Sequence, residues 1–356
     1  GKRELKFALE AYWAGKSDQQ VLLGVADDIK RGNWQAQSSL DYVPVGDFSL
    51  YDQVLDMSEA LGNLPRRAQT GVGLDNYFRS ARGRAPDSEQ ECASSEMTKW
   101  WNTNYHYLVP EFNRATDFTL ACSRIVEEIR QAKKQGVNAK PVLIGPVTYL
   151  WLGVFRDKDG VAEGIDSGKP LALGLLHRLL PVYKALLHAI KAEGVEWVQL
   201  DEPILGLDID AAWSNAIAES YHYLNDVKLN KLVATYFSRL GNNLRLACDL
   251  PIEGLHIDAV TAPEEVNRVI DWLPAHKVLS LGVIDGRNIW AADFRKILNW
   301  LAPSVAAFKG DIWSCETVNE LFYNGRHSHI TFVFVTQDAG DLGKKQRGQV
   351  DIVFAT

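Results

Sequence analysis

Apolar residues recur along most of the chain in two patterns that alternate. Short runs rich in β-branched and aromatic residues predict buried strands, and segments with an apolar residue every three or four positions predict amphipathic helices. The predicted strands are residues 41–48, 140–146, 194–203, 232–237, 254–258 and 278–284. Strands that alternate with helices in one direction form a parallel sheet, and such a sheet closed on itself is a (β/α)8 barrel of the TIM type. We therefore expect an α/β barrel.

The two ends of the chain depart from this alternation. Residues 2–14 predict a helix, and a second helix is predicted from Ser17, with Gln20 completing a capping box. Residues 64–90 are rich in Arg, Gly and Pro and are expected to lie outside the core. Beyond about Trp313 the alternation is lost. We therefore expect a barrel domain at residues 1–313 and a tail of uncertain structure at residues 314–356.

Two adjacent carboxylates, Asp201 and Glu202, end the predicted strand at residues 194–203. Successive side chains on a strand point to opposite faces, so at most one of the two faces the barrel mouth. That carboxylate is suited to general acid or base chemistry or to ligand binding. The alternative is a solvated strand end that pairs with a neighbouring Lys or Arg. Because barrel sites lie at the carboxyl ends of strands, we favour a role facing the ligand.

Hydrogen-bonding and basic side chains form two further candidate sites. The segment at residues 96–107 mixes aromatic rings with Lys99, Asn102 and Asn104, a combination that suits a wall against a flat polar ligand. Arg3 and Lys6 are spaced one turn apart on the first predicted helix and, with Lys99, are suited to clamp an anion. Composition by itself favours an ordinary solvated helix face.

Two other strand ends carry residues with alternative interpretations. His256 and Asp258 are half of a metal site or, more simply, His256 is a buried histidine satisfied by a carboxylate or a backbone group. The glycine-rich turn at residues 282–288 lacks the spacing of a phosphate-binding loop, and Arg287 is a candidate contact at the rim of the site.

Composition excludes several classes of protein. The net charge of −7 over 356 residues argues against a general nucleic-acid-binding protein. The four cysteines form no Cys-x-x-Cys pair, so neither a disulfide framework nor a zinc knuckle is indicated. No segment has the roughly 20 apolar residues that a membrane span needs, and no signal peptide is apparent. We expect a cytoplasmic protein that binds neither nucleic acid nor membrane.

Short motifs spread along residues 2–313 resemble the N-terminal half of cobalamin-independent methionine synthase, the 5-methyltetrahydropteroyltriglutamate–homocysteine methyltransferase. The matching segments are Arg3-Glu4-Leu5-Lys6, Pro44-Val45-Gly46-Asp47-Phe48, Gly83-Arg84-Ala85-Pro86, Glu96-Met97-Thr98-Lys99-Trp100, Asn102-Thr103-Asn104-Tyr105-His106-Tyr107, Gly145-Pro146-Val147-Thr148, Asp201-Glu202-Pro203 and Gly286-Arg287-Asn288-Ile289-Trp290. So many separate matches in one order make chance resemblance improbable.

The resemblance implies two barrels with the active site between them. In the family, the C-terminal barrel binds zinc through His, Cys, Glu and Cys, and the N-terminal barrel binds no metal and helps to bind the folate. The motif matched by Arg3, Glu4, Leu5 and Lys6, and the lysine matched by Lys99, contact the triglutamylated methylfolate there. Asp201 and Glu202 match a motif of both barrels and are expected to support the site. The resemblance therefore predicts no catalytic residue, no metal ligand and no cobalamin in this chain.

The reaction implied for the whole enzyme is attack of a zinc-bound homocysteine thiolate on the methyl group of the folate, which gives methionine. The family's opening strand would precede Gly1, and the tail does not match the family, so we expect a barrel incomplete at its first and last strands. Without the zinc barrel, its expected partner, this chain is not expected to catalyse methyl transfer. The alternatives are a stand-alone module that binds polyglutamyl folate or assembles with a partner, and a hydrolase that uses Asp201 with a second carboxylate.

Overall fold

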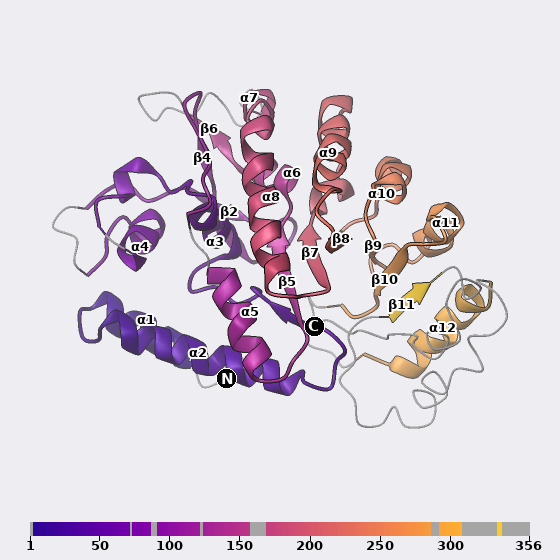
Figure 1. Cartoon of the computed structure of the whole chain (residues 1–356), viewed down its shortest axis with the longest axis horizontal. Helices are drawn as coiled ribbons and strands as arrows, with labels where there is room; N and C mark the ends of the chain where they lie inside the picture. The colour runs from indigo at the N-terminus through magenta and orange to yellow at the C-terminus, as the bar shows by residue number, and fades with distance from the viewer. Residues whose placement is uncertain are drawn as a thin grey trace. The chain divides into compact units, whose positions relative to one another are not determined.

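Parallel strands and the helices that connect them make up most of the computed structural model (Figure 1). The structure describes residues 3–71, 73–86, 91–121, 124–156, 169–285, 292–307 and 333–336. The chain divides into two compact units, the first at residues 1–39 and 43–196 and the second at residues 40–42 and 197–356. Each unit contains strands and helices in alternation, as the sequence predicts.

The first unit begins with two packed helices and continues with short strands. Its elements are α1 (Glu4–Trp13), α2 (Gln19–Ala36), β1 (Val43–Val45), α3 (Gln53–Ala60), η1 (Arg66–Ala68), α4 (Leu74–Arg82), β2 (Met97–Lys99), β3 (His106–Leu108), β4 (Glu111–Phe112), α5 (Arg124–Lys134), β5 (Ala139–Ile144), α6 (Pro146–Leu152), β6 (Val154–Phe155), α7 (Lys169–Leu173) and α8 (Leu176–Ala192). Strands β1 and β5 pair in parallel, as do β4 and β6, whereas β2 and β3 form an antiparallel hairpin.

The second unit holds the longer run of parallel strands. Its elements are β7 (Trp197–Asp201), η2 (Pro203–Gly206), α9 (Ala211–Leu224), β8 (Asn230–Ala234), η3 (Gly241–Asn243), α10 (Leu244–Asp249), β9 (Gly254–Asp258), α11 (Glu265–Trp272), β10 (Val278–Gly282), α12 (Phe294–Ala307) and β11 (Val333–Thr336). Strands β7, β8, β9 and β10 pair in parallel in that order, and β11 pairs with β10 in the antiparallel direction.

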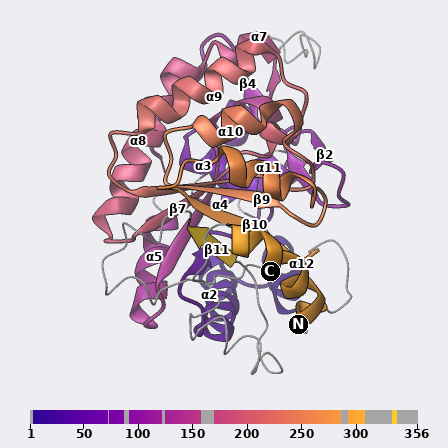
Figure 2. The same ribbon diagram turned by 90° about the vertical axis from the view of Figure 1, so that its right-hand side faces the viewer.

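Helices α9, α10 and α11 lie along one side of the strands of the second unit (Figures 1 and 2). Val198, Leu200 and Val233 of β7 and β8 are fully buried. Because side chains alternate between the two faces of a strand, Gln199 and Asp201 lie on the face opposite Val198 and Leu200. The polar side chains of β7 are thus on the face that, in a barrel, points inward.

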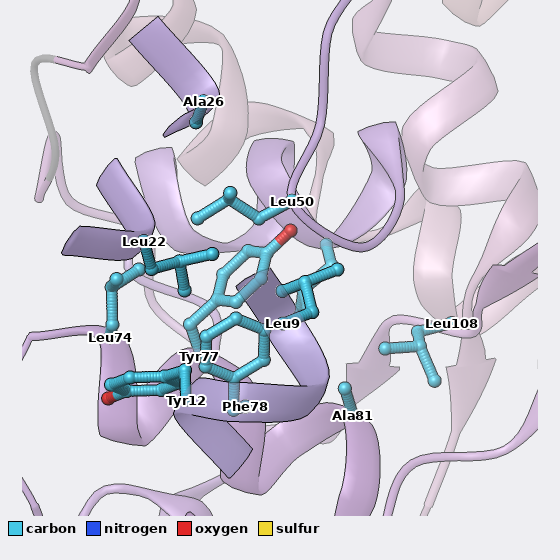
Figure 3. Close-up of a cluster of buried hydrophobic side chains, with 11 residues drawn as sticks. Leu9, Tyr12, Leu22, Ala26, Leu50, Leu74, Tyr77, Phe78, Ala81 and Leu108 are labelled. Atoms are coloured by element: carbon cyan, nitrogen blue, oxygen red, sulfur yellow. The ribbon is translucent and has the colours of Figure 1, made fainter. Parts of the chain in front are cut away.

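A cluster of buried side chains forms a core in the first unit (Figure 3). Its fully or largely buried members come from α1, α2, α3, α4, the loop before α3 and strand β3, and they include Leu9, Tyr12, Leu22, Leu50, Leu55, Leu74, Tyr77, Phe78, Ala81 and Leu108. The rings of Tyr12 and Phe78 lie 5.5 Å apart, and that of Tyr77 lies edge-on to Phe78 at 5.3 Å. The pair of Tyr12 and Phe78 joins α1 to α4, and that of Tyr77 and Phe78 lies within α4.

The expectation that residues 64–90 lie outside the core is wrong, because α4 supplies Leu74, Tyr77, Phe78 and Ala81 to that cluster. These residues have the i, i+3, i+4, i+7 spacing of an amphipathic helix. The polar residues and glycines around them obscured the pattern.

The expected capping box at the start of the second helix is also wrong. The helix begins at Gln19, and the side chain of Asp18 accepts the backbone N–H of Val21 at 2.9 Å. Asp18 is therefore the N-cap, and Ser17 lies before it. Within the tail that the sequence left unassigned, the structure describes strand β11 alone. None of the described helices is long and apolar enough to cross a membrane.

Candidate functional site

The basic motif at the start of the chain lies at the N-terminal end of α1. Glu4 opens the helix, where its negative charge complements the helix dipole. Leu5 is half-buried and packs against the core cluster, whereas Arg3, Glu4 and Lys6 are exposed. Lys6 makes an exposed ion pair with Glu10 at 3.7 Å, of the kind that contributes little to stability. The leucine thus anchors the motif, and its charged side chains point to solvent.

Arg3 is not on the helix as the sequence predicted. It precedes α1 and has a left-handed backbone, with φ of 64° and ψ of 30°. The helical spacing of one turn between Arg3 and Lys6 therefore does not apply. The backbone N–H of Phe7 nevertheless donates to the carbonyl of Arg3 at 3.1 Å, which fixes Arg3 against the first turn.

Lys99, Asn102 and Asn104 lie on the β2–β3 hairpin, and all three side chains are exposed. Lys99 is opposite His106 in the register of the two strands. Opposite residues of an antiparallel pair share a face, so these two basic side chains are neighbours. The hairpin thus presents a polar, basic edge to solvent.

The turn of the hairpin is held by hydrogen bonds. The backbone N–H of Trp100 donates to the carbonyl of Tyr105 at 2.8 Å, and the hydroxyl of Thr103 donates to the carbonyl of Trp100 at 2.6 Å. The hydroxyl of Tyr107 donates to the carbonyl of Leu152 at 3.1 Å, which ties β3 to the end of α6. The ring of Trp101 lies 4.7 Å from that of Trp100. The exposed polar residues are therefore carried on a well-supported loop.

Helix α1 and the hairpin are brought together by the core cluster, since Leu9 of α1 and Leu108 of β3 both belong to it (Figure 3). Leu5 of α1 packs against the same cluster. The elements that carry Arg3, Lys6 and Lys99 are therefore parts of one packed unit.

Asp52 fixes the hairpin to the start of α3, a role that the sequence analysis missed. One carboxylate oxygen accepts the backbone N–H groups of Val54 and Leu55 at 2.8 and 2.9 Å, and the other accepts that of Leu108 at 3.1 Å. Burial raises the pKa of Asp52 to about 6 despite these donors. An aspartate before an apolar helix is a recognisable N-cap signal, but nothing local predicts its bond to Leu108.

Asp201 and Glu202 belong to the second unit and point to opposite faces, as the strand geometry predicted. Asp201, at the end of β7, accepts the side-chain amide of Gln199 at 2.8 Å and the hydroxyl of Tyr236 at 3.0 Å. Burial, and then the charge of Asp201, raise the pKa of Tyr236 well above its usual range. Glu202 is fully buried and accepts the hydroxyl of Tyr221, a residue of α9, at 3.1 Å. Glu202 therefore joins the strand to the helix beside it.

Asp201 also belongs to a row of side chains that crosses the sheet. In the strand register Asp201 of β7 is opposite Ala234 of β8. Ala234 is in turn opposite His256 of β9, and His256 is opposite Ser280 of β10. His256 is largely buried, and its Nδ1 lies 2.9 Å from the hydroxyl oxygen of Ser280. His256 is buried as the simpler interpretation expected, but its Nδ1 meets the hydroxyl of Ser280 where a carboxylate or backbone group was expected. Asp258 accepts backbone N–H groups of Phe237 and of the turn that follows β9.

No group of three or more His, Cys, Asp or Glu side chains with metal-binding geometry occurs among the described residues. Zinc requires three or four such ligands, so the described part of the chain does not fit the ion that the resemblance assigns to the C-terminal barrel. The last candidate, Arg287, lies outside the described residues.

Comparison with known proteins identifies the family. Residues 1–308 match the model of the cobalamin-independent synthase N-terminal domain. The fold is similar to that of a B12-independent methionine synthase from Shewanella sp. W3-18-1, solved in complex with selenomethionine. That similarity has a TM-score of 0.56 at 16% identity and covers 82% of this chain and 79% of that chain.

A second similar structure is a putative vitamin-B12 independent methionine synthase from Listeria monocytogenes. Its TM-score is 0.54 at 12% identity, with 85% of each chain covered. At these identities the solved structures bear on the fold, and they confirm the predicted α/β fold of TIM-barrel type. Since the family model covers most of the chain, the protein belongs to the cobalamin-independent methionine synthases, a family of methyltransferases, and contains their N-terminal domain.

Proposed function

We propose that this chain is the folate-contacting part of a methionine synthase, and that it binds 5-methyltetrahydropteroyltriglutamate through Arg3, Glu4, Leu5, Lys6 and Lys99. The observation that carries the proposal is the common packing of α1 and the β2–β3 hairpin, which leaves Arg3, Lys6 and Lys99 exposed on one packed unit. A triglutamate tail presents several carboxylates, and lysine and arginine pair with carboxylates through charge-assisted hydrogen bonds.

The exposed amides of Asn102 and Asn104 extend this surface. Both donate and accept hydrogen bonds, so they suit the polar edges of a pterin or the peptide links of the tail. Asp201 and Glu202, in the second unit, are proposed as supporting residues, because their carboxylates are engaged by Gln199, Tyr236 and Tyr221.

The methyl acceptor of the whole enzyme is homocysteine, and its thiol is activated by zinc in the C-terminal barrel that the resemblance implies. Because the described residues do not fit a zinc site, we propose that this chain supplies folate binding and does not by itself transfer the methyl group. We also propose a barrel domain at residues 1–313 and a separate tail at residues 314–356.

The test is a calorimetric titration of the chain with methyltetrahydrofolate that carries one or three glutamates. We expect tighter binding of the triglutamate, and a loss of about tenfold or more when Lys99→Ala removes one charge-assisted contact. Lys134→Ala is the matched control, because Lys134 is an exposed lysine of α5 in the same unit. Equal affinities of wild type and Lys99→Ala would refute the assignment of Lys99.

A second assay separates binding from catalysis. Methionine formation from homocysteine and the triglutamylated folate is expected to be absent with the chain alone, even with zinc supplied. Turnover under these conditions would contradict the proposed division of the enzyme. Tight folate binding without turnover is also the behaviour of a stand-alone binding module, and restoration of activity by an added zinc-binding barrel would distinguish the two.

A further inference from the structure

The end of α1 that is remote from Arg3 and Lys6 carries a second basic feature. Trp13 is the last residue of α1, and Arg82 is the last residue of α4. The guanidinium carbon of Arg82 lies 3.9 Å from the centroid of the Trp13 ring, a cation–π contact. The indole is also in contact with Phe78, whose ring meets it edge-on at 5.6 Å. The tryptophan is thus a rigid platform for the arginine.

The positive charge of Arg82 is not neutralised by any carboxylate among the described residues. Its nearest basic neighbour in sequence is Arg84, which makes an exposed ion pair with Glu91 at 3.6 Å. The pKa of Arg82 is lowered, first by partial burial and then by repulsion from Arg84. An anion that approaches the guanidinium favours its charged form and so acts against both effects.

The indole of Trp13 supplies an independent observation. Its N–H is covered from solvent, and no described atom accepts a hydrogen bond from it. A buried donor without an acceptor costs free energy, and an unseen ion or water is one of the few explanations for such a group. An oxygen acceptor at the edge of the indole would satisfy this N–H and would lie near the positive charge of Arg82, whose guanidinium carbon is 3.9 Å from the ring centroid.

We propose that Arg82 and Trp13 bind a carboxylate of a ligand that carries several, and this rests on the proposed binding of a polyglutamylated folate. Lys6 and Trp13 are seven residues apart on α1, which is two turns, so they share a face and are separated by about 10 Å along the helix axis. A tail with several carboxylates reaches both ends of α1, whereas one glutamate reaches only one. Arg82 is therefore a residue that selects for tail length.

A structural role for Arg82 predicts different behaviour. A basic side chain in the last turn of α4 interacts favourably with the helix dipole, and this stabilises the fold without any ligand. Such a role changes the melting temperature when Arg82 is replaced and leaves ligand affinity unchanged. It also leaves the Trp13 N–H without an acceptor.

The experiment titrates wild type, Arg82→Gln, Arg82→Lys and Lys99→Ala with three ligands. These are methyltetrahydrofolate with one glutamate, the same folate with three glutamates, and the tri-γ-glutamate peptide without the pterin. We expect Arg82→Gln to weaken triglutamate binding by about tenfold or more and to leave monoglutamate binding within about twofold. The lysine variant, which retains the charge but not the planar stack, is expected to be weakened severalfold.

The matched control is Arg245→Gln. Arg245 also lies over an indole, that of Trp272 at 5.0 Å, but it is paired with Asp249 at 3.6 Å. This control is expected to bind all three ligands as wild type does. Thermal melts of each variant confirm that it is folded. If Arg82→Gln does not fold, Arg82→Lys tests the proposal in its place. An unchanged affinity of Arg82→Lys for the triglutamate overturns the proposal.

The outcomes separate this proposal from the function on which it rests. In one outcome, wild type prefers the triglutamate, Lys99→Ala loses this preference and Arg82→Gln keeps it. The Arg82 site is then overturned, and the proposed folate binding stands. If wild type binds neither folate, the proposed function fails. The titration with the tri-γ-glutamate peptide then tests the Arg82 site by itself. Peptide binding that Arg82→Gln abolishes supports a polycarboxylate site, and peptide binding that is absent or unaffected overturns it.

Discussion

Asp52 illustrates how one buried carboxylate joins segments that are far apart in sequence. It caps α3 with one oxygen and holds the hairpin strand β3 with the other. Its desolvation is the largest cause of the raised pKa of this group, and the charge of Asp56 adds to it. The exposed Lys99 on the hairpin therefore depends, for its position, on a carboxylate that is costly to ionise in the folded state.

This carboxylate is expected to make folding stability depend on pH. The folded-state pKa of about 6 lies above the value of 3.8 that is usual for an aspartate, so the folded protein binds the proton more tightly than the unfolded chain does. The contribution of Asp52 to the free energy of unfolding is then largest below pH 4. It falls by up to about 3 kcal/mol in total as the pH rises from about 4 through the folded-state pKa of about 6.

Urea denaturation gives the free energy of unfolding of wild type and of Asp52→Asn at each pH between 4 and 7. The contribution of Asp52 is the difference between the two proteins in how this free energy changes with pH. Asp18→Asn is the control, because Asp18 also caps a helix but is exposed. The same pH slope in wild type and in Asp52→Asn would show that Asp52 is not the group responsible.

At the scale of elements, α4 shows how a helix end limits substitution. Gly83 ends this helix with φ of 77°, a left-handed conformation that favours glycine. A Cβ at this position would overlap the carbonyl oxygen of Cys92, whose own N–H donates to the carbonyl of Gly83 at 2.8 Å. The turn after α4 is thus closed by contacts that leave no room for a side chain.

We predict that Gly83→Ala lowers the free energy of unfolding by at least about 2 kcal/mol, through backbone strain and the overlap with Cys92. Gly32→Ala is the matched substitution. Gly32 is in the interior of α2, where nothing lies within 4 Å of an added Cβ, so alanine is expected to stabilise the protein by about 0.5–1 kcal/mol. Chemical denaturation of both variants tests the pair. Equal effects of the two substitutions would contradict the account of the α4 end.

At the scale of the whole molecule, the net charge opposes the proposed ligand. The chain carries a net charge of −7, whereas the proposed folate surface is formed by Arg3, Lys6 and Lys99. Anion binding therefore depends on local cations at short range, and such exposed charges are screened by salt.

Salt dependence is accordingly a prediction for the intact chain. Raising sodium chloride from about 0.05 M to about 0.5 M shortens the Debye length by roughly threefold. We expect the affinity for triglutamylated folate to fall more than the affinity for the monoglutamate. Calorimetric titrations at both salt concentrations measure this, and a triglutamate affinity that is insensitive to salt would argue against recognition of the tail by exposed cations.

Much of the secondary structure follows from local pattern, because periodicity records which face of an element is buried. Strand β9 occupies the predicted residues 254–258, and strand β10 begins at the predicted residue 278. The pattern of α4 was present too, but its arginines and flanking glycines were misread as a surface segment. The motifs around Arg3 and Lys99 are short contiguous segments, so the family was recognisable from the sequence without knowledge of the fold.

Contacts between distant residues were decided by the tertiary structure. The bond from Leu108 to Asp52, the stacking of Arg82 on Trp13 and the row from Asp201 to Ser280 each join different elements. Periodicity determines which face of each element is apolar, but the meeting of two particular side chains depends on the packing of the whole core. Burial then raised the pKa of Asp52 and left the Trp13 N–H without an acceptor in the described part of the chain. The cost of removing water from a polar group exists only once the fold has enclosed it.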